Sequence, residues 1–326
     1  MGKTVFSESK NIQFNFKEIF KNQFFWTFSG FLALCLLMIV FSDKFLTYSN
    51  MINVLRQISI NGVIAAGMTF VILTSGIDLS VGSVMAFSGT IMAGAMVNWG
   101  LSPILAVVIG ICIGLIFGLI NGSLVAFLKM PAIIVTLAMM EVPRGLALLY
   151  TGGYPLSGIP ESFAVLGRGY WFNIIPVPVV IMLFVYLIAY LILNHLPMGR
   201  YIYAIGGNEE AVRLSGINVR LYKIIPFVIS GITASVSGVL ITSRLMSGQP
   251  MVGTGFELDA IAAVVLGGTD IAGGRGQIIG TLLGALILGV LNNGLNLMGI
   301  SPYAQRVVKG LIIVIAVYFS SRKNNK

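Results

Sequence analysis

Long apolar stretches follow one another along this 326-residue chain, and they constrain its fold more than any other feature. An α-helix needs about 20 mainly apolar residues to cross the hydrocarbon core of a membrane. Ten segments approach or reach that length, namely residues 24–41, 54–73, 83–97, 104–127, 132–150, 179–194, 224–243, 257–271, 277–297 and 304–320. Polar or glycine- and proline-rich breaks separate them, so the pattern predicts an all-α, polytopic membrane protein with about ten transmembrane helices.

The composition excludes a water-soluble globule and a disordered chain. Hydrophobic residues make up 57% of the sequence and charged residues 10%, whereas soluble domains have roughly 45–50% and about 25%. Disordered segments are polar and charged. The net charge of +9 would suggest nucleic acid in a soluble protein, but in a membrane protein basic residues collect in cytoplasmic loops. We therefore expect the chain to lie in a lipid bilayer and to bind no nucleic acid.

The positions of the basic residues predict the orientation. With the N-terminus inside and ten crossings, 13 of the 20 lysines and arginines fall on the cytoplasmic side and five on the outside. This bias predicts cytoplasmic N- and C-termini. The expected organisation is a cytoplasmic N-terminal segment (residues 1–23), a membrane domain (24–320) with a cytoplasmic loop at 195–223, and a cytoplasmic tail (321–326).

The sequence offers no set of residues for catalysis or for metal binding. It has one histidine and two cysteines, which are too few for a histidine-based metal cluster or a catalytic triad. No Gly-x-x-x-x-Gly-Lys-Ser/Thr motif occurs, so a P-loop ATP site is absent from the chain. We expect no catalytic residue, no metal and no cofactor here, and any energy from ATP would enter through a partner subunit.

A polar break inside the apolar pattern surrounds Asp78. The segment Thr74–Gly82 contains two glycines, two serines and the acidic side chain of Asp78. Charge within a membrane domain is costly and usually functional, and a broken helix is tolerated where it lines a cavity. One interpretation is therefore a pathway or gating element, and the other is a turn in which Asp78 caps the next helix.

Other polar residues of the apolar runs are candidates for the same translocation pathway or gate. Together with Asp78, they are Ser75, Asn61, Asn121, Asn292 and Asn293. Ser75–Gly82 is similar to Gly267–Gly274, and the residues around Asn121 are similar to those around Asn292. Transporters are often built from two related halves, so a possible internal pseudo-repeat is one interpretation. A chance match between glycine-rich segments is the other.

Acidic side chains also occur at helix starts and within helices. Glu257 and Asp259 begin the segment 257–271, where they either favour the helix dipole or form an extracytoplasmic docking contact. Glu141 and Arg144 are three residues apart and can pair along one helix.

The segment 195–223 carries complete helix start and stop signals. Asn208 can cap a short helix, Glu209 and Glu210 stand in its first turn, and Gly216 can end it. A short capped helix between two spans suits docking of a partner, while the alternative is an ordinary charged loop. The candidate ATPase-coupling residues are Gly207, Asn208, Glu209, Glu210, Ala211, Arg213, Leu214 and Gly216.

Four long runs carry a family resemblance that covers about residues 50–320. They are Gly67–Ser83, Gly199–Asn218, Glu257–Thr269 and Gly280–Leu297. These runs closely resemble bacterial ABC sugar-importer permeases of the ribose type.

The resemblance implies a type II ABC importer-like permease that imports ribose or a related monosaccharide. It implies a homodimer in the bacterial cytoplasmic (inner) membrane, with an ABC ATPase subunit on the cytoplasmic face and an extracytoplasmic sugar-binding protein. ATP and Mg would be bound by the ATPase, and Asn208–Gly216 would be the coupling helix, with Glu209, Glu210 and Arg213 as its ATPase contacts.

The sequence departs from the ribose-type pattern at two acidic positions. Asp270-Ile271 stands where Ser-Leu is usual, and Glu141 stands where an apolar residue is usual. An ion- or proton-coupled secondary transporter that uses Asp78, Glu141 and Asp270 is therefore the alternative function. A membrane receptor or scaffold without transport is a third.

Overall fold

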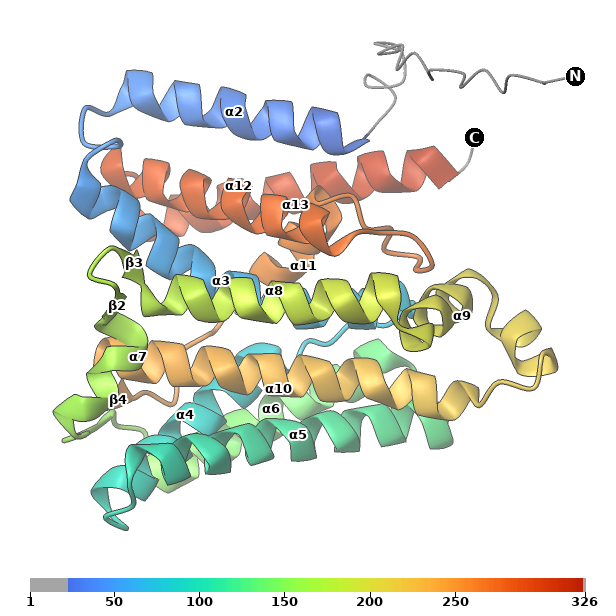
Figure 1. Cartoon of the computed structure of the whole chain (residues 1–326), viewed down its shortest axis with the longest axis horizontal. Coiled ribbons are helices and arrows are strands. Elements are labelled where there is room, and N and C mark those ends of the chain that lie inside the picture. The colour runs from blue at the N-terminus through green and yellow to red at the C-terminus, as the bar shows by residue number, and fades with distance from the viewer. Residues whose placement is uncertain (1–22, 325–326) are drawn as a thin grey trace, which may run out of the picture.

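The structure is a computed structural model that describes residues 23–324, and its helices lie side by side in one elongated bundle (Figure 1). The elements in chain order are α2 (Gln23–Phe41), α3 (Tyr48–Leu73), α4 (Val81–Val97), α5 (Pro103–Phe127), α6 (Ala132–Thr151), β1 (Leu156–Ser157), η1 (Glu161–Phe163), α7 (Ala164–Arg168), β2 (Tyr170–Trp171), β3 (Ile175–Pro176), α8 (Val177–His195), α9 (Pro197–Leu214), α10 (Val219–Leu245), β4 (Ser247–Gly248), α11 (Phe256–Leu266), α12 (Ile278–Leu297) and α13 (Pro302–Asn324). Of the predicted N-terminal segment, only Gln23 lies within the described residues.

Each of the ten predicted apolar segments contains a helix, but the number of crossings is not confirmed. Seven of the described helices are long and apolar enough to cross a membrane: α2, α3, α5, α6, α8, α10 and α12. Helices α4 and α11 are shorter, with 17 and 11 residues. The structure thus confirms a helical, polytopic chain, while ten crossings and the internal repeat stay predictions.

Helix α3 lies at the centre of the bundle. It packs against α8, α10, α11 and α12, and its residues from Ile58 to Leu73 are almost all buried. Two of its buried hydroxyl groups are satisfied within the helix, because the Thr69 hydroxyl donates to the Ala65 carbonyl and the Ser59 hydroxyl to the Leu55 carbonyl. A helix that is apolar on every side can be buried in this way.

Glycines allow α5 and α10 to touch through their backbones. A Cβ atom built at Gly231 would overlap the carbonyl oxygen of Gly114, and one at Gly118 would lie 2.5 Å from the carbonyl oxygen of Phe227. Small residues serve this purpose in membranes, where helices associate by close packing rather than by the hydrophobic effect. Gly110, Gly114 and Gly118 of α5 therefore all lie at helix contacts, with Gly110 packed against Met92 of α4.

Helix α11 is shorter than the predicted segment 257–271. It ends at Leu266, and residues 267–277 form a loop in which Gly268, Gly273 and Gly274 have positive φ angles. Glycine adopts this conformation without steric cost, so the glycine-rich sequence ends the helix before Asp270. Asp270 accordingly lies in a loop and not within a span.

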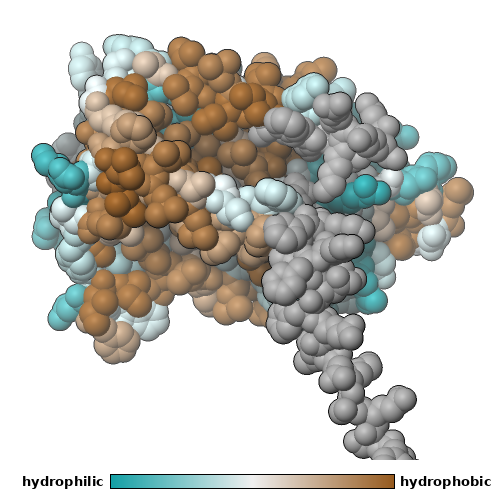
Figure 2. Space-filling model, turned by 90° about the horizontal axis from the view of Figure 1, so that it is seen from above, coloured by the Kyte–Doolittle hydropathy of each residue, from teal (hydrophilic) through white to brown (hydrophobic). Residues whose placement is uncertain are grey.

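The surface of the bundle carries a broad apolar belt. In Figure 2 brown side chains cover the middle of the visible face, and teal side chains gather toward both ends of the long axis. Exposed residues of this kind include Leu36, Val40, Ile104 and Phe184, which are 60–80% exposed. A large exposed apolar surface between polar ends is typical of a protein surrounded by lipid.

The two ends of the bundle differ in structure. Helix α9 lies at one end, together with the first turn of α2 and the last turn of α13 (Figure 1). At the other end the α6–α8 connection contains η1, α7 and short strands, with β1 paired to β4 and β2 paired to β3 in antiparallel register.

Replacing Gly231 by leucine is expected to destabilise the bundle by about 1–3 kcal/mol, because the new side chain overlaps the α5 backbone. Thermal unfolding of the purified protein in detergent measures this effect. Gly30→Leu in α2 is the matched control, since a Cβ atom there meets nothing within 4 Å. Equal melting temperatures for the two variants would contradict the proposed close contact.

Candidate functional site: a buried carboxylate and a capped helix

A buried carboxylate fixes the break between α3 and α4. Asp78 is 1% exposed, and its Oδ1 accepts hydrogen bonds from the Ser80 amide at 3.0 Å and the Ser80 hydroxyl at 2.6 Å. Its Oδ2 accepts one from the Ser230 hydroxyl of α10 at 2.8 Å. Asn121 of α5 donates to Ser80 Oγ at 2.9 Å. The Asp78 cluster (Asp78, Ser80, Asn121 and Ser230) thus joins the break to two helices.

This geometry bears on both interpretations of Asp78. Residues 74–80 are not helical, and Asp78 binds Ser80, the residue that precedes α4. Asp78 thus holds the residue that precedes α4 and also binds α10, but no described side chain caps the first turn of α4 itself. Ser75, which has a φ angle of 61°, lies at the α9 end of the bundle and contacts α9. The assignment of either residue to a pathway or gate stays a prediction.

A second polar group surrounds the first turn of α11. Lys309 Nζ of α13 lies 2.9 Å from Asp259 Oδ2, and Asn61 Nδ2 of α3 donates to the same oxygen at 3.5 Å. Asn292 of α12 lines a small cavity beside Asn61 and Asp259. The Oδ1 atoms of Asn61 and Asn292 have no hydrogen-bond partner among the described residues. The structure therefore brings Asn61 and Asn292 together, as candidate pathway residues, around Asp259.

Other predicted residues lie apart from these two groups. Asn293 exchanges hydrogen bonds with Asn50 at 2.8 and 3.0 Å. Glu257 Oε1 accepts a hydrogen bond from the Gly255 amide at 3.1 Å. Because Asp259 is 6% exposed and paired with Lys309, its carboxylate is internal in this chain. Extracytoplasmic docking by Glu257 and Asp259 stays a prediction.

Sequence reasoning missed some partners. Lys309 was recognisable only as a lysine within an apolar run, and such a charge usually has a partner.

The expected ion pair between Glu141 and Arg144 is not among the ion pairs of the described residues. Arg144 Nη1 donates instead to the carbonyl oxygens of Pro250 at 2.5 Å and Val252 at 2.9 Å.

Helix α9 breaks at Asn208 and continues as a short exposed helix. Asn208 has φ −159° and ψ 94°, and its Oδ1 accepts a hydrogen bond from the Ala211 amide at 3.0 Å. The helix ends before Gly216, whose φ angle is 80°. Both predicted helix signals are confirmed. The first half of α9, Pro197–Gly207, was not predicted, because Gly206 and Gly207 weaken the helical pattern.

Charged side chains on this short helix are paired. Glu209 Oε2 lies 2.8 Å from Lys223 Nζ, and Glu210 pairs with Arg213. The hydrogen bond and charge of Arg213 lower the pKa of the exposed Glu210 carboxyl. Glu210 and Arg213 therefore form an exposed ion pair on this helix.

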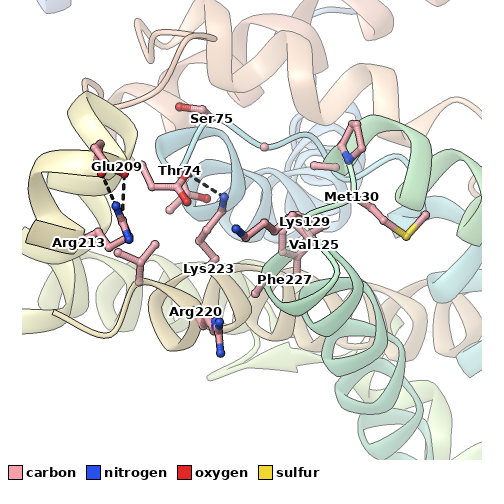
Figure 3. Close-up of a pocket in the computed structure, with 16 residues that line it drawn as sticks. Thr74, Ser75, Val125, Lys129, Met130, Glu209, Arg213, Arg220, Lys223 and Phe227 are labelled. Carbon is pink, nitrogen blue, oxygen red and sulfur yellow. Dashed lines mark hydrogen bonds and ion pairs between the residues drawn. The ribbon is translucent and has the colours of Figure 1, made fainter. Parts of the chain in front are cut away.

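A cavity of about 710 Å³ lies between this helix and the ends of α3, α5 and α10. Figure 3 shows Lys129, Arg213 and Lys223 around it, with Thr74 and Ser75 on the side of α3. The exposed helix therefore borders open space at this end of the bundle. Among residues 23–324, no group of three or more histidine, cysteine, aspartate or glutamate side chains is placed to hold a metal ion.

Comparisons with known proteins place the chain among transport proteins. The family model described as branched-chain amino acid transport system / permease component matches residues 50–317. The ribose import permease protein RbsC of Bacillus subtilis is 51% identical over 299 residues, which cover 91% of this chain and 92% of that protein. The Escherichia coli K12 protein of the same name is 48% identical, with 90% and 92% coverage.

A permease named for a different sugar is also similar to this chain. The L-arabinose transport system permease protein AraH of Escherichia coli K12 is 45% identical over 284 residues, which cover 87% of this chain and 86% of that protein. No solved structure matches the chain.

Replacing Asp78 by alanine is expected to destabilise the protein by about 1–3 kcal/mol, because it leaves buried hydroxyl groups without an acceptor. Ser230→Ala removes only one donor to the carboxylate and should cost less. Thermal unfolding in detergent ranks the variants, with Asp43→Ala as the control, since Asp43 lies in an exposed turn. If Asp78→Ala and the control unfold at the same temperature, the carboxylate does not hold α4 and α10 together.

Proposed function

Because the chain belongs to the family described as branched-chain amino acid transport system / permease component, we propose that it is the membrane-spanning subunit of an ATP-driven importer of ribose or a related monosaccharide. The observation that carries this proposal is the identity of 48–51% with ribose import permeases over about nine-tenths of the chain. The relatives named as sugar permeases favour this function over the ion- or proton-coupled alternative.

The ATPase partner would dock on the short helix of α9. Four features support this proposal: the helix is exposed, it is capped at Asn208, it ends at Gly216 and it carries the charges of Glu209, Glu210 and Arg213. ATP and Mg would be bound by that partner. Closure of the ATPase would then move the helix and switch the permease between outward- and inward-facing states.

The cytoplasmic side is proposed to be the end of the bundle that carries α9. The first turn of α2 and the last turn of α13 lie at the same end (Figure 1). Lys129, Arg220 and Lys223 add positive charge there, in agreement with the rule that basic residues collect on the cytoplasmic side. The opposite end, with η1, α7 and the paired strands, would face the sugar-binding protein.

A second copy of the chain would complete the pathway. Glu141 of α6 and Arg306 of α13 are exposed charges within helices, and Lys309 of α13 is partly exposed. Exposing such charges to lipid is costly. We therefore place the faces of α6 and α13 toward a second copy and an aqueous pathway between the two, with Asn61 and Asn292 on the inner side of α13.

Reversing two charges tests the docking helix. Glu209→Lys combined with Glu210→Lys is expected to weaken association with the ATPase subunit by about tenfold or more, because the reversal puts positive charge where the proposed interface has two acidic side chains. Co-purification of the complex and sugar uptake measure this effect. Glu161→Lys at the opposite end is the control and should leave association unchanged. Normal assembly of the double variant would show that residues 209 and 210 are not part of the interface.

Competition between sugars tests the substrate. Uptake of labelled ribose by cells that lack their own ribose permease, but express this chain with its ATPase and binding protein, should be reduced most by unlabelled ribose. Xylose, galactose and a nucleoside should compete less, because a site built for hydroxyl groups rejects poorly matched analogues strongly. Stronger competition by one of the other compounds would assign that compound as the substrate class.

A further inference from the structure

Three segments that are distant in sequence meet through their backbones at the α9 end of the bundle. The Gly274 amide of the 267–277 loop donates to the Leu73 carbonyl oxygen at the end of α3, at 2.9 Å. The Ser75 hydroxyl donates to the Ala272 carbonyl oxygen at 2.6 Å and lies 3.4 Å from the carbonyl oxygen of Gly206 in α9. The glycine junction is the set Leu73, Ser75, Gly206, Gly273 and Gly274.

The junction has no room for side chains. A Cβ atom at Gly206 would overlap both the Leu73 carbonyl oxygen and the Gly274 amide nitrogen, and one at Gly273 would overlap the Ser75 hydroxyl. One at Gly274 would lie 2.7 Å from the Gly207 nitrogen. Most of these neighbours are backbone atoms, which cannot turn aside as a flexible side chain does. A movement of one segment is therefore passed to the others by direct contact.

The junction lies between two features already described. On one side, Gly206 is two residues before the break at Asn208, where the exposed helix begins. On the other side, Ser75 is three residues before Asp78, which binds Ser230 of α10. The 267–277 loop leads directly into α12. The exposed helix is thus connected to α3, to the Asp78 cluster and to α12 within a few residues.

We propose that the glycine junction is the transmission contact of the permease, with Gly206, Ser75 and Gly273 as positioning residues that couple movement of the exposed α9 helix to α3 and α12. This inference rests on the proposed function, because the movement would originate in an ATPase docked at residues 208–216. Coupling between distant sites can be carried by packed and hydrogen-bonded segments that have two discrete arrangements. The junction supplies the contacts, and the outward- and inward-facing states of the proposed importer would be its two arrangements.

The test compares transport with ATP hydrolysis in the complete complex. The permease, its ATPase and its binding protein are reconstituted in liposomes, and labelled ribose taken up per ATP hydrolysed is measured. Gly206→Ala is expected to assemble with the ATPase and hydrolyse ATP, but to move about tenfold less sugar per ATP. Ser75→Ala, which only removes a hydrogen bond, should lower this ratio about threefold.

Matched variants separate this proposal from a general loss of structure. Gly30→Ala in α2 makes the same change where a Cβ atom meets nothing within 4 Å, and its ratio should equal that of the unmodified protein. If Gly206→Ala fails to fold, Ser75→Ala decides the question. The proposed role of the junction is wrong if both variants take up as much ribose per ATP as the unmodified protein. It is also wrong if Gly206→Ala is unfolded and Ser75→Ala keeps the unmodified ratio.

The docking proposal has its own readout. If the double charge reversal at Glu209 and Glu210 leaves assembly intact, the assigned ATPase contacts are wrong, whatever the junction variants do. If that reversal abolishes assembly while Gly206→Ala and Ser75→Ala transport normally, the docking helix stands and the junction is wrong.

Discussion

Between Leu73 and Val81 the chain leaves helical geometry inside a bundle with an apolar surface, so the polar groups of this break need partners within the protein. The two carboxylate oxygens of Asp78 serve this purpose, because they accept hydrogen bonds from Ser80 and Ser230. The break would otherwise leave buried polar groups unsatisfied, each costing about 1–3 kcal/mol. Asp78 thereby ties the start of α4 and the middle of α10 to the end of α3, where α10 also packs against both helices.

Close backbone contacts at glycines also hold the segments of the bundle together. Gly114 and Gly231 bring α5 to α10, and Gly267 and Gly280 bring the start of α12 to the end of α11. In a hydrocarbon environment these contacts provide the packing that the hydrophobic effect provides in water. At the α9 end the same kind of contact joins two helices to a loop, because Gly206 of α9 touches Leu73 of α3 and Gly274 of the 267–277 loop. Glycine therefore provides both the close helix packing of the bundle and the backbone contacts at its α9 end.

Local sequence patterns predicted the features that depend on neighbours in the chain. The apolar runs located the helices, and Asn208 and Gly216 located the two ends of the exposed helix, since caps act within three or four residues. Contacts between residues far apart in the chain could not be predicted from these local patterns. Ser230 is 152 residues from Asp78, and Lys309 is 50 residues from Asp259. Single-sequence periodicity carries no information on such pairs, which is why Asp78 had two interpretations and Lys309 had none.

We propose that ATP hydrolysed by a partner subunit drives sugar through this chain. Uptake of labelled ribose into cells, measured during ATP depletion and separately with an uncoupler at maintained ATP, tests it most directly. Uptake that stops without ATP and persists with the uncoupler is the predicted result. Uptake that survives ATP depletion and collapses with the uncoupler would contradict the account, and it would return Asp78, Glu141 and Asp270 to consideration as ion-coupling residues.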